Sequence, residues 1–506
     1  MRGWLAFAAT WVVTAGCASA KFTAETAAAD NALVMLANID DDDQDAIRDG
    51  LDARLNGDRD LEDLVRLTLS VRCLGDSHVT LAVVPSSVAQ HVRVFQKGQT
   101  WSPLVAGETR MPCGETQLAV EALRTRSQLW DGRASLQVAV DGHLLATLSL
   151  RVAAVIFPDV TKPARQVYAV EVAEEGAKPN SELLDLLGTL QTPVTLVNGE
   201  PYHFERWIID ALTTGVQRRP DGAVQDVLVA MDRKTGALGL ERLPAALLAP
   251  DRGLALPGRD EPNLLSYGGN LQVLPPHPGY PEGRLLIGGG GTRHMGPSTR
   301  AWLEAQEVQA PALEVSTEWL ESGHVDEVVA FVPSSSTRGW ALVIASPRLA
   351  LTRLETLKAH GQGAALLRTA RGDRAVDAIL SERSLRVFNE EAEERLQSVR
   401  RALVEATGLH NDEVIELPQL FDKSPNGLAV ALHPSQVNLV AIEGRALLLS
   451  SDVDSTVFEP VVRERLRAHG VTPTFVNETD AYHSLGGGLH CALEVQRRAS
   501  ATRPSQ

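Results

Sequence analysis

Hydrophobic and polar residues alternate along the first part of the chain, from residue 32 to about residue 157. The alternation comes in short runs separated by turn signals, as in strands that bury one face. In the clearest run Leu136, Val138 and Val140 share a face, and Asp141-Gly142 supplies the following turn. The next run continues the period of two at Leu144, Ala146, Leu148, Leu150 and Val152. Short strands at this spacing predict a β-sandwich.

Beyond residue 163 the pattern changes to apolar runs interleaved with helical stretches. The segment from Phe157 to Pro163 contains two prolines and is predicted to be a linker. Strand-like runs follow at residues 166–172, 194–197, 227–230, 284–287, 327–332, 340–345, 437–442 and 446–449. This alternation predicts an α/β region that is larger than a typical single domain.

One helix of this region is clear from its apolar stripe, in which Leu396, Val399 and Leu403 recur at helical spacing. Asn389 is predicted to cap its start, because an asparagine side chain can accept a hydrogen bond from the first turn. Gly408 is predicted to end it.

The segment from Trp319 to Glu327 precedes the apolar run Val328 to Val332 and is predicted to be the start of a buried strand. Residues two apart in a strand share a face, so His324 and Asp326 would point into one pocket. An imidazole beside a carboxylate can bind a cation and transfer protons near neutral pH. The alternative is a satisfied polar pair at a strand end.

The composition limits the classes of function. The 506 residues are enough for about two to four domains with their own cores. A content of 44% hydrophobic and 22% charged residues is ordinary for globular proteins, so global disorder is not expected. The formal net charge of -16 argues against a nucleic-acid partner and favours cationic partners or metal ions.

Much of the charge lies in an acidic loop from Asn38 to Asp63, which holds eleven carboxylates and three arginines. The carboxylates belong to Asp40, Asp41, Asp42, Asp43, Asp45, Asp49, Asp52, Asp58, Asp60, Glu62 and Asp63. They repel one another unless a cation is present. The alternation of Asn38, Asp40 and Asp42 is typical of calcium ligands, although Asp43 stands where an EF-hand requires glycine. Composition alone leaves a calcium site and a solvated acidic loop both open.

The N-terminus has the layout of a secretory signal peptide: Met1-Arg2-Gly3, the apolar run Trp4 to Val13, then small residues. Ala18-Ser19-Ala20 offers a cleavage site, and Cys17 offers an alternative in which this cysteine carries a lipid anchor. No later apolar run reaches transmembrane length. The protein is therefore expected to be exported, whether secreted, periplasmic or lipoprotein-anchored.

Three cysteines remain beyond the leader. Cys73 and Cys113 are predicted to form a disulfide because they share a domain, which leaves Cys491. Cys491 follows Gly486-Gly487-Gly488 and adjoins His490, features that suit a reachable, stabilised thiolate nucleophile. The alternative is a small buried apolar residue.

Six segments resemble, in the same order, motifs of the protein-arginine deiminases. They are Arg206-Trp207-Ile208-Ile209-Asp210, Gly269-Asn270-Leu271-Gln272-Val273, Ser322-Gly323-His324-Val325-Asp326-Glu327, Ala345-Ser346-Pro347-Arg348, Leu417-Pro418-Gln419-Leu420-Phe421 and Leu489-His490-Cys491. The resemblance implies an α/β five-bladed pentein propeller with the active site in its channel, preceded by an all-β immunoglobulin-like domain. The expected division is a signal peptide (1–20), an immunoglobulin-like domain with the acidic loop (21–160) and a pentein-type deiminase domain (161–500).

The resemblance implies that the catalytic residues are Asp210, His324, Asp326 and Cys491. The two carboxylates would grip the planar guanidinium of a substrate arginine, and Trp207 would pack on its aliphatic stem. The thiolate would attack the guanidinium carbon, and His324 would protonate the leaving ammonia and then activate water. The expected activity is conversion of peptidyl-arginine to peptidyl-citrulline.

Two other functions remain as alternatives. One is deimination of a free small guanidine such as arginine or agmatine. It is favoured because arginines that the family places around the substrate backbone are missing: Leu485 stands at one position, and Arg233 is only the nearest candidate for the other. The second is a catalytically silent, calcium-dependent interaction protein.

The resemblance also implies calcium ligands in the acidic loop, with one more from the following domain. They are Asn38, Asp40, Asp42, Asp49, Asp52, Asp60, Asp63 and Asp251. The family's activating calcium sites beside the active site are not matched, because Ile209, Ala211, Thr213 and Gln272 replace expected ligands and only Asp232 remains. Calcium is therefore predicted to be mainly structural.

Overall fold

The computed structural model describes residues 14–15, 18–24, 28–29, 32–52, 55, 59–105, 108–233 and 239–499. Cys17, the predicted alternative lipid-anchor site, lies outside the described residues. The predicted cleavage site Ala18-Ser19-Ala20 forms the first part of strand β2 (Ala18–Ala24). None of the described helices is both long and apolar enough to cross a membrane.

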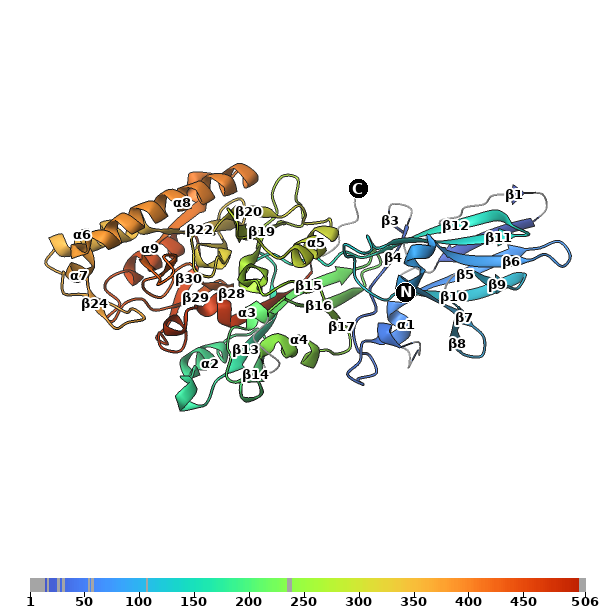
Figure 1. Ribbon diagram of the computed structural model, residues 1–506, viewed down its shortest axis with the longest axis horizontal. Helices are drawn as coiled ribbons and strands as arrows, with labels where there is room; N and C mark the ends of the chain where they lie inside the picture. Colours follow the sequence, from blue (N-terminus) through green and yellow to red (C-terminus); the bar gives the residue numbers. More distant parts are fainter. Residues whose placement is uncertain are drawn as a thin grey trace.

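The N-terminal part is built from two six-stranded sheets, which occupy the right-hand side of Figure 1. The first has the order β1 (Thr14–Ala15), β2, β5 (Val65–Arg72), β10 (Gly114–Ala122), β7 (Val92–Lys97) and β8 (Trp101–Pro103). The second has the order β3 (Ala28–Ala29), β4 (Ala32–Met35), β12 (His143–Val152), β11 (Arg133–Val140), β6 (Val79–Val84) and β9 (Glu108–Met111). Apolar side chains of both sheets share one core. Cys73 and Cys113 form the predicted disulfide.

The β11–β12 hairpin confirms the alternating pattern except at one residue. Leu136 and Val138 are buried, and Asp141 and Gly142 have positive φ in the turn. The register shifts between Val138 and Ala139, which is a β-bulge in the pairing. The prediction for Leu144 was therefore wrong, because the bulge leaves this residue 51% exposed.

Among the described residues after the N-terminal sheets, five three-stranded sheets share one connection pattern. In each sheet the central strand pairs antiparallel with one neighbour and parallel with the other. The sheets are β14 (Val194–Asn198)–β13 (Ala164–Glu171)–β31 (Leu493–Arg497), β15 (Leu212–Arg218)–β16 (Val224–Ala230)–β17 (Arg252–Ala255), β18 (Leu271–Leu274)–β19 (Arg284–Gly289)–β20 (Leu313–Ser316), β21 (Val329–Pro333)–β22 (Trp340–Ser346)–β25 (Val414–Pro418) and β28 (Val440–Ile442)–β29 (Arg445–Leu449)–β30 (Thr472–Val476). The last strand, β31, joins the first of these sheets.

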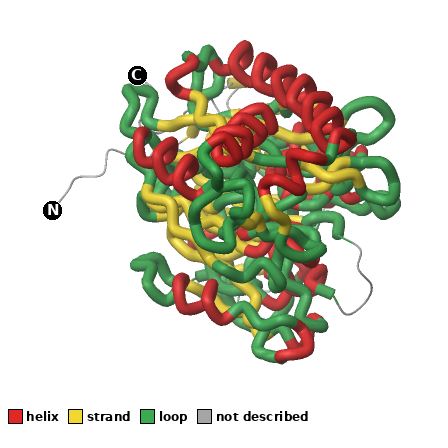
Figure 2. Tube along the Cα trace, turned by 90° about the vertical axis from the view of Figure 1, so that its left-hand side faces the viewer, coloured by secondary structure: helices red, strands yellow, loops and turns green. Residues whose placement is uncertain are grey.

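Helices connect each central strand to its parallel partner. They are α2 (Ser181–Leu187), α4 (Leu243–Ala246), α5 (Pro297–Ala305), the group α6 (Pro347–Ala359), α7 (Val376–Ser381) and α8 (Arg383–Thr407), and α9 (Glu459–Ala468). Figure 2 shows strands towards the middle of this part and helices mostly around them. The antiparallel outer strands β15, β18, β21, β28 and β31 all line one cavity of about 130 Å³.

Helix α8 confirms the predicted stripe and end but not the predicted start. Leu396, Val399 and Leu403 are buried, and Gly408 has the positive φ of a C-cap. The helix begins at Arg383, so the prediction that Asn389 caps it was wrong. Asn389 is buried inside the helix, where its amide donates to Leu385 O and Phe421 O and accepts from Phe421 N.

The predicted linker from Phe157 to Pro163 is held against the rest of the molecule. Gln309 accepts a hydrogen bond from Phe157 N at 2.8 Å, and Phe157 belongs to the core of the N-terminal sheets. That core also contains Val227 of β16 and Trp302 of α5. The N-terminal sheets are thus packed on the following part of the chain rather than tethered to it. The domain boundary at residue 160 and the immunoglobulin-like character remain predictions.

Candidate active site and acidic cluster

Four predicted catalytic residues from three separate turns meet around Gly269. Asp210 lies on α3 (Ile208–Ala211), Asp326 on the 3₁₀ turn η8 (Val325–Glu327) with His324 directly before it, and Cys491 on α10 (Leu489–Ala492). A Cβ added to Gly269 would lie 2.7 Å from His324 Nδ1, 3.0 Å from Asp210 Oδ1 and 3.2 Å from Asp326 Oδ2. Cys491 Sγ lies 3.5 Å from Asp326 Oδ2. The structure therefore brings the four residues into one pocket.

The local structure of His324 and Asp326 differs from the predicted strand. His324 is extended, residues 325–327 form η8, and strand β21 begins only at Val329. Asn270 holds this turn in place, because its Oδ1 accepts from both Val325 N and Gly288 N. The segment does lead into a buried strand as predicted, but the strand alternation predicted for His324 and Asp326 was wrong. The prediction that both residues point into one pocket is confirmed.

The hydrogen bonds of His324 identify the nitrogen that can exchange protons. Nε2 lies 2.9 Å from Leu264 O, so a neutral ring carries its proton on Nε2. Nδ1 then faces the pocket, 3.9 Å from Asp210 Oδ1.

The two carboxylates have unequal surroundings. Burial raises the pKa of Asp210 to about 6, opposed by His324 and assisted by the negative charge of Asp326. Asp326 is fully buried, and its Oδ2 lies 2.9 Å from His490 Nδ1. Its Oδ1 makes no hydrogen bond to the described residues. A guanidinium, with five N–H donors in one plane, could satisfy this oxygen.

Cys491 is a free, buried thiol. Burial raises its pKa well above the ordinary range, and the negative charges of Asp326 and Asp210 act in the same direction. The amide of Asn438, 3.3 Å from Sγ, lowers the pKa. The resting sulfur is therefore a thiol, and a bound cation would favour its ionisation.

Arg233 occupies an unexpected position. Its Nη1 forms an ion pair with Asp210 Oδ2 at 2.8 Å, its Nη2 pairs with Glu205, and its guanidinium lies 5.3 Å from the centre of the Tyr267 ring. The sequence suggested Arg233 only as a candidate for contacting a substrate backbone. Its contact with Asp210 joins side chains 23 positions apart and leaves no periodic signal in the sequence.

Trp207 packs beside the pocket. Its ring lies 6.2 Å from that of Tyr482, and a Cβ on Gly487 would come within 2.6 Å of it. Gly487 thus provides room for the indole. Leu485, at the other position where a substrate-contacting arginine was expected, is 43% exposed.

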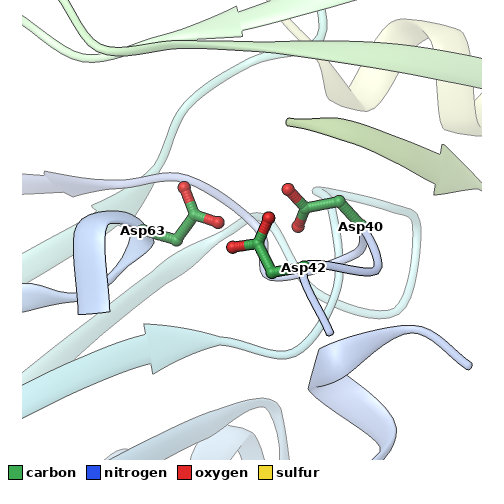
Figure 3. Close-up of side chains that lie close together, drawn as sticks. All are labelled: Asp40, Asp42 and Asp63. Carbon is green, nitrogen blue, oxygen red and sulfur yellow. The ribbon is translucent and has the colours of Figure 1, made fainter. Parts of the chain in front are cut away.

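The acidic loop forms a second site, at the junction with β16. Three groups of carboxylates each have oxygens within 4.8 Å of one another: Asp40, Asp42 and Asp63; Asp41, Asp43 and Asp49; and Asp42, Asp49 and Asp60. Figure 3 shows the carboxylates of Asp40, Asp42 and Asp63 turned towards one another. Of the predicted ligands, Asp52 and Asp251 join none of these groups of described residues.

The chemistry of this acidic cluster fits a hard cation. Burial raises the pKa of Asp42 to about 6, of Asp49 to about 8 and of Asp63 to about 9, with neighbouring carboxylates adding to the effect. Buried oxygens of Asn38, Asp40, Asp42 and Gln225 make no hydrogen bond to the described residues. The sequence analysis missed Gln225, whose amide donates to Asp40 Oδ1 at 2.9 Å. Such oxygens are the ligands that calcium prefers.

Comparison with known proteins agrees with this geometry. The family model for protein-arginine deiminase matches residues 144–503. Human protein-arginine deiminase type-1 is 30% identical over 490 residues, covering 87% of this chain and 72% of the relative. Mouse protein-arginine deiminase type-4 is 28% identical over 519 residues, covering 92% and 76%. The chain belongs to the protein-arginine deiminase family.

Solved structures of agmatine deiminases match more weakly. The C. jejuni enzyme is 10% identical with a TM-score of 0.41, covering 68% of this chain and 97% of that chain. The Enterococcus faecalis enzyme is 11% identical with a TM-score of 0.42, covering 68% and 96%. Similarity at this level carries no argument about the reaction.

Gly269→Ala is expected to lower kcat/KM at least about 100-fold, because the new Cβ would occupy the point where His324, Asp210 and Asp326 meet. The protein should remain folded by circular dichroism, because only side-chain ends are contacted. Gly98→Ala is the matched control, since its Cβ would meet nothing nearer than Thr100 O at 3.7 Å. Full activity of Gly269→Ala would contradict the placement of the substrate at this point.

Proposed function

We propose that this protein hydrolyses arginine side chains of polypeptides to citrulline and releases ammonia. The observation that carries the proposal is the meeting of one imidazole and two carboxylates around Gly269, with a thiol 3.5 Å from Asp326 Oδ2. Membership of the protein-arginine deiminase family supports it. A thiol, a proton carrier and two anionic groups are what hydrolysis of a permanently charged guanidinium requires.

Binding would begin with the carboxylates. Asp210 and Asp326 grip the guanidinium from two sides, and Asp326 Oδ1 gains a donor that the described residues do not supply. The substrate's positive charge offsets the two negative charges that hold Cys491 as a thiol. Trp207 would cover the aliphatic stem of the arginine.

The thiol proton then passes to His324 Nδ1, and the sulfur attacks the guanidinium carbon. A C–S bond forms, and a C–N bond breaks as His324 returns the proton to the departing ammonia. His324 next takes a proton from water, whose oxygen attacks the same carbon. The C–S bond breaks, the sulfur regains its electron pair, and the ureido group of citrulline leaves.

The five-bladed propeller is part of this proposal. Its support is the repetition of five three-stranded sheets of one connection pattern, whose antiparallel outer strands all line one cavity. The proposed immunoglobulin-like domain would be formed by the two six-stranded sheets.

A free small guanidine is the second candidate substrate. The observation that favours it is the position of Arg233, whose guanidinium is held by Asp210 and Glu205 inside the pocket. While Arg233 holds these two carboxylates, its guanidinium does not bind the backbone of a peptide.

We also propose that the acidic cluster binds calcium and that this ion is structural. Its raised carboxylate pKa values and unsatisfied oxygens support an ion there. Near the active site, Gln272 already donates to Val329 O at 2.8 Å, and Asp232 accepts from Asp260 N at 2.7 Å. These contacts support a pocket that assembles without activating calcium.

Export is proposed as well. The Cys73–Cys113 disulfide supports it, because such bonds persist in oxidising compartments.

A benzoyl-arginine ester and an arginine-containing peptide are both expected to yield citrulline and ammonia, measured colorimetrically and by mass. Cys491→Ala should lower turnover at least about 1000-fold, because no other group replaces the nucleophile. Turnover of free arginine alone would contradict the peptidyl substrate. If the wild-type protein turns over no guanidine, the alternative that remains is a catalytically silent, calcium-dependent interaction protein.

Calcium is expected to raise Tm more at pH 8 than at pH 5.5. Carboxylates with raised pKa stabilise the calcium-free fold at low pH, and this stability is lost as the pH rises through about 6 to 9. Bound calcium restores this stability, because it binds the ionised carboxylates of the folded protein. Asp42→Asn should reduce the shift because Asp42 belongs to two of the groups, whereas Asp45→Asn in the same loop belongs to none and should not. Steep calcium dependence of activity in a protein that stays folded in chelator would contradict a structural role.

A further inference from the structure

Asn438 is a buried residue that contacts the reacting sulfur and was not singled out by the sequence. It lies just before β28, and its Nδ2 is 3.3 Å from Cys491 Sγ and 3.4 Å from Asp326 O. Its Oδ1 accepts hydrogen bonds from the backbone N–H groups of His490 at 3.0 Å and Cys491 at 3.4 Å. Asn438 therefore connects the start of α10 to the sulfur that α10 carries.

These contacts fix which end of the amide faces the sulfur. Backbone N–H groups can only donate, so the side-chain atom next to them must be the carbonyl oxygen. In a reversed amide, the amino group would face the backbone N–H groups of His490 and Cys491, and two donors cannot form a hydrogen bond. The amino group is consequently the nearer end of the amide, 3.3 Å from Cys491 Sγ, whereas Oδ1 lies 3.7 Å from the same sulfur.

The position of Asn438 in the fold repeats that of the proposed catalytic residues. Each of the five strands that line the cavity is directly preceded by a turn, and these turns supply residues to the active site, which do not themselves line that cavity. These residues are Asp210 before β15, Gly269 before β18, Asp326 before β21, Asn438 before β28 and Cys491 before β31. Asn438 is the contribution of the fifth sheet.

We propose that Asn438 is a further catalytic residue, whose amide N–H donates to the Cys491 sulfur and stabilises the thiolate. The proposal rests on the proposed function. The thiolate is stabilised at two stages of the reaction, once before the sulfur attacks and once when the sulfur leaves.

The charges around Cys491 show why a neutral donor is useful there. Asp326 on η8 and Asp210 on α3 oppose ionisation of the sulfur. The nearby guanidinium of Arg233 is already engaged, because it pairs with Asp210. An amide stabilises negative charge on sulfur without neutralising the carboxylates that must hold the substrate.

Gly488 makes this contact possible. A Cβ at this position would lie 2.5 Å from Asn438 Oδ1 and 3.0 Å from its Cγ. The glycine run before Cys491 therefore admits two side chains, Trp207 at Gly487 and Asn438 at Gly488.

Asn438→Asp keeps the oxygen that binds α10, removes the N–H that faces the sulfur and adds a negative charge beside it. Asn438→Ala removes the N–H without adding charge, so slower alkylation in both variants assigns the effect to the N–H. Alkylation of Cys491 by iodoacetamide, followed by peptide mass, reports thiolate formation without using deimination. At pH 8 we expect the alkylation rate to fall at least about tenfold, and the midpoint of its pH profile to rise by at least about one unit. kcat should fall in parallel.

Asn389→Asp is the matched control, since it makes the same change at a buried, hydrogen-bonded asparagine of α8, outside the pocket. Asn438→Ala provides a second variant if the aspartate variant does not fold, and the same slower alkylation is expected. A folded Asn438 variant whose alkylation profile stays within twofold of wild type would overturn the proposal. Slower alkylation in a protein whose wild type lacks deiminase activity would instead count against the proposed function.

A separate observation concerns Arg233, which places a guanidinium of the chain itself on Asp210. Nη1 holds Asp210 Oδ2, Glu205 holds Nη2, and Tyr267 lies under the guanidinium plane. A substrate needs both oxygens of Asp210 for a bidentate grip. The geometry points to Arg233 as an internal competitor that substrate must displace from Asp210, and this inference also rests on the proposed function.

Binding of arginine amide to a Cys491→Ala background separates this competition from chemistry. Adding Arg233→Gln should tighten binding at least about tenfold, because the competing guanidinium is gone. Arg242→Gln is the control, since Arg242 lies over Tyr202 away from Asp210. Arg233→Lys serves if the glutamine variant does not fold, and a smaller gain is expected because ammonium cannot bridge both carboxylates. Unchanged or weaker binding in a folded Arg233 variant would overturn the inference. If Arg233→Gln tightens binding as expected but the wild-type protein turns over no guanidine, the result would count against the proposed function alone.

Discussion

The active site depends on the close approach of several side chains to a residue that has none. His324, Asp210 and Asp326 come from separate turns, and all reach the place where a side chain of Gly269 would stand. Any Cβ there would fill the space in which a substrate guanidinium could contact both carboxylates and the imidazole. Gly487 and Gly488 have the same role beside Cys491. None of these three glycines has a positive φ, so backbone conformation does not require glycine there. Glycine is required because neighbouring functional groups occupy the space of a side chain.

The second constraint is uncompensated negative charge, which the molecule carries in two places. In the active site, burial raises the pKa of Cys491, and the negative charges of Asp326 and Asp210 raise it further. In the acidic cluster, burial raises the pKa of Asp49 to about 8 and of Asp63 to about 9, and neighbouring carboxylates add to the effect. In both sites the ionised form is disfavoured, and a bound cation would offset this cost. In the proposed function that cation is transient in one site, as substrate, and lasting in the other, as calcium.

The sequence predicts the parts of the structure that depend on local periodicity. The apolar runs became strands of the sheets, five of them the central strands, and the stripe at Leu396 and Leu403 became the buried face of α8. The errors arose where tertiary contacts override local preference. A bulge exposes Leu144, and Phe421 draws Asn389 into the interior instead of leaving it as a cap. Site residues that lie in recognisable motifs could be predicted from the sequence. Asn438 and Gln225 could not, because their hydrogen-bond partners lie 53 and 185 positions away and leave no local pattern.

The order of the strands explains how such distant residues become neighbours. The antiparallel outer strands of the five sheets begin beside one another at the cavity, so the turns before them meet irrespective of their separation in the chain. The nucleophile lies in the last of these turns. Cys491 precedes β31, which pairs with β13 at the beginning of this region. The position of the sulfur beside Asp326 and Asn438 therefore depends on the pairing of the last strand with the first sheet of this region.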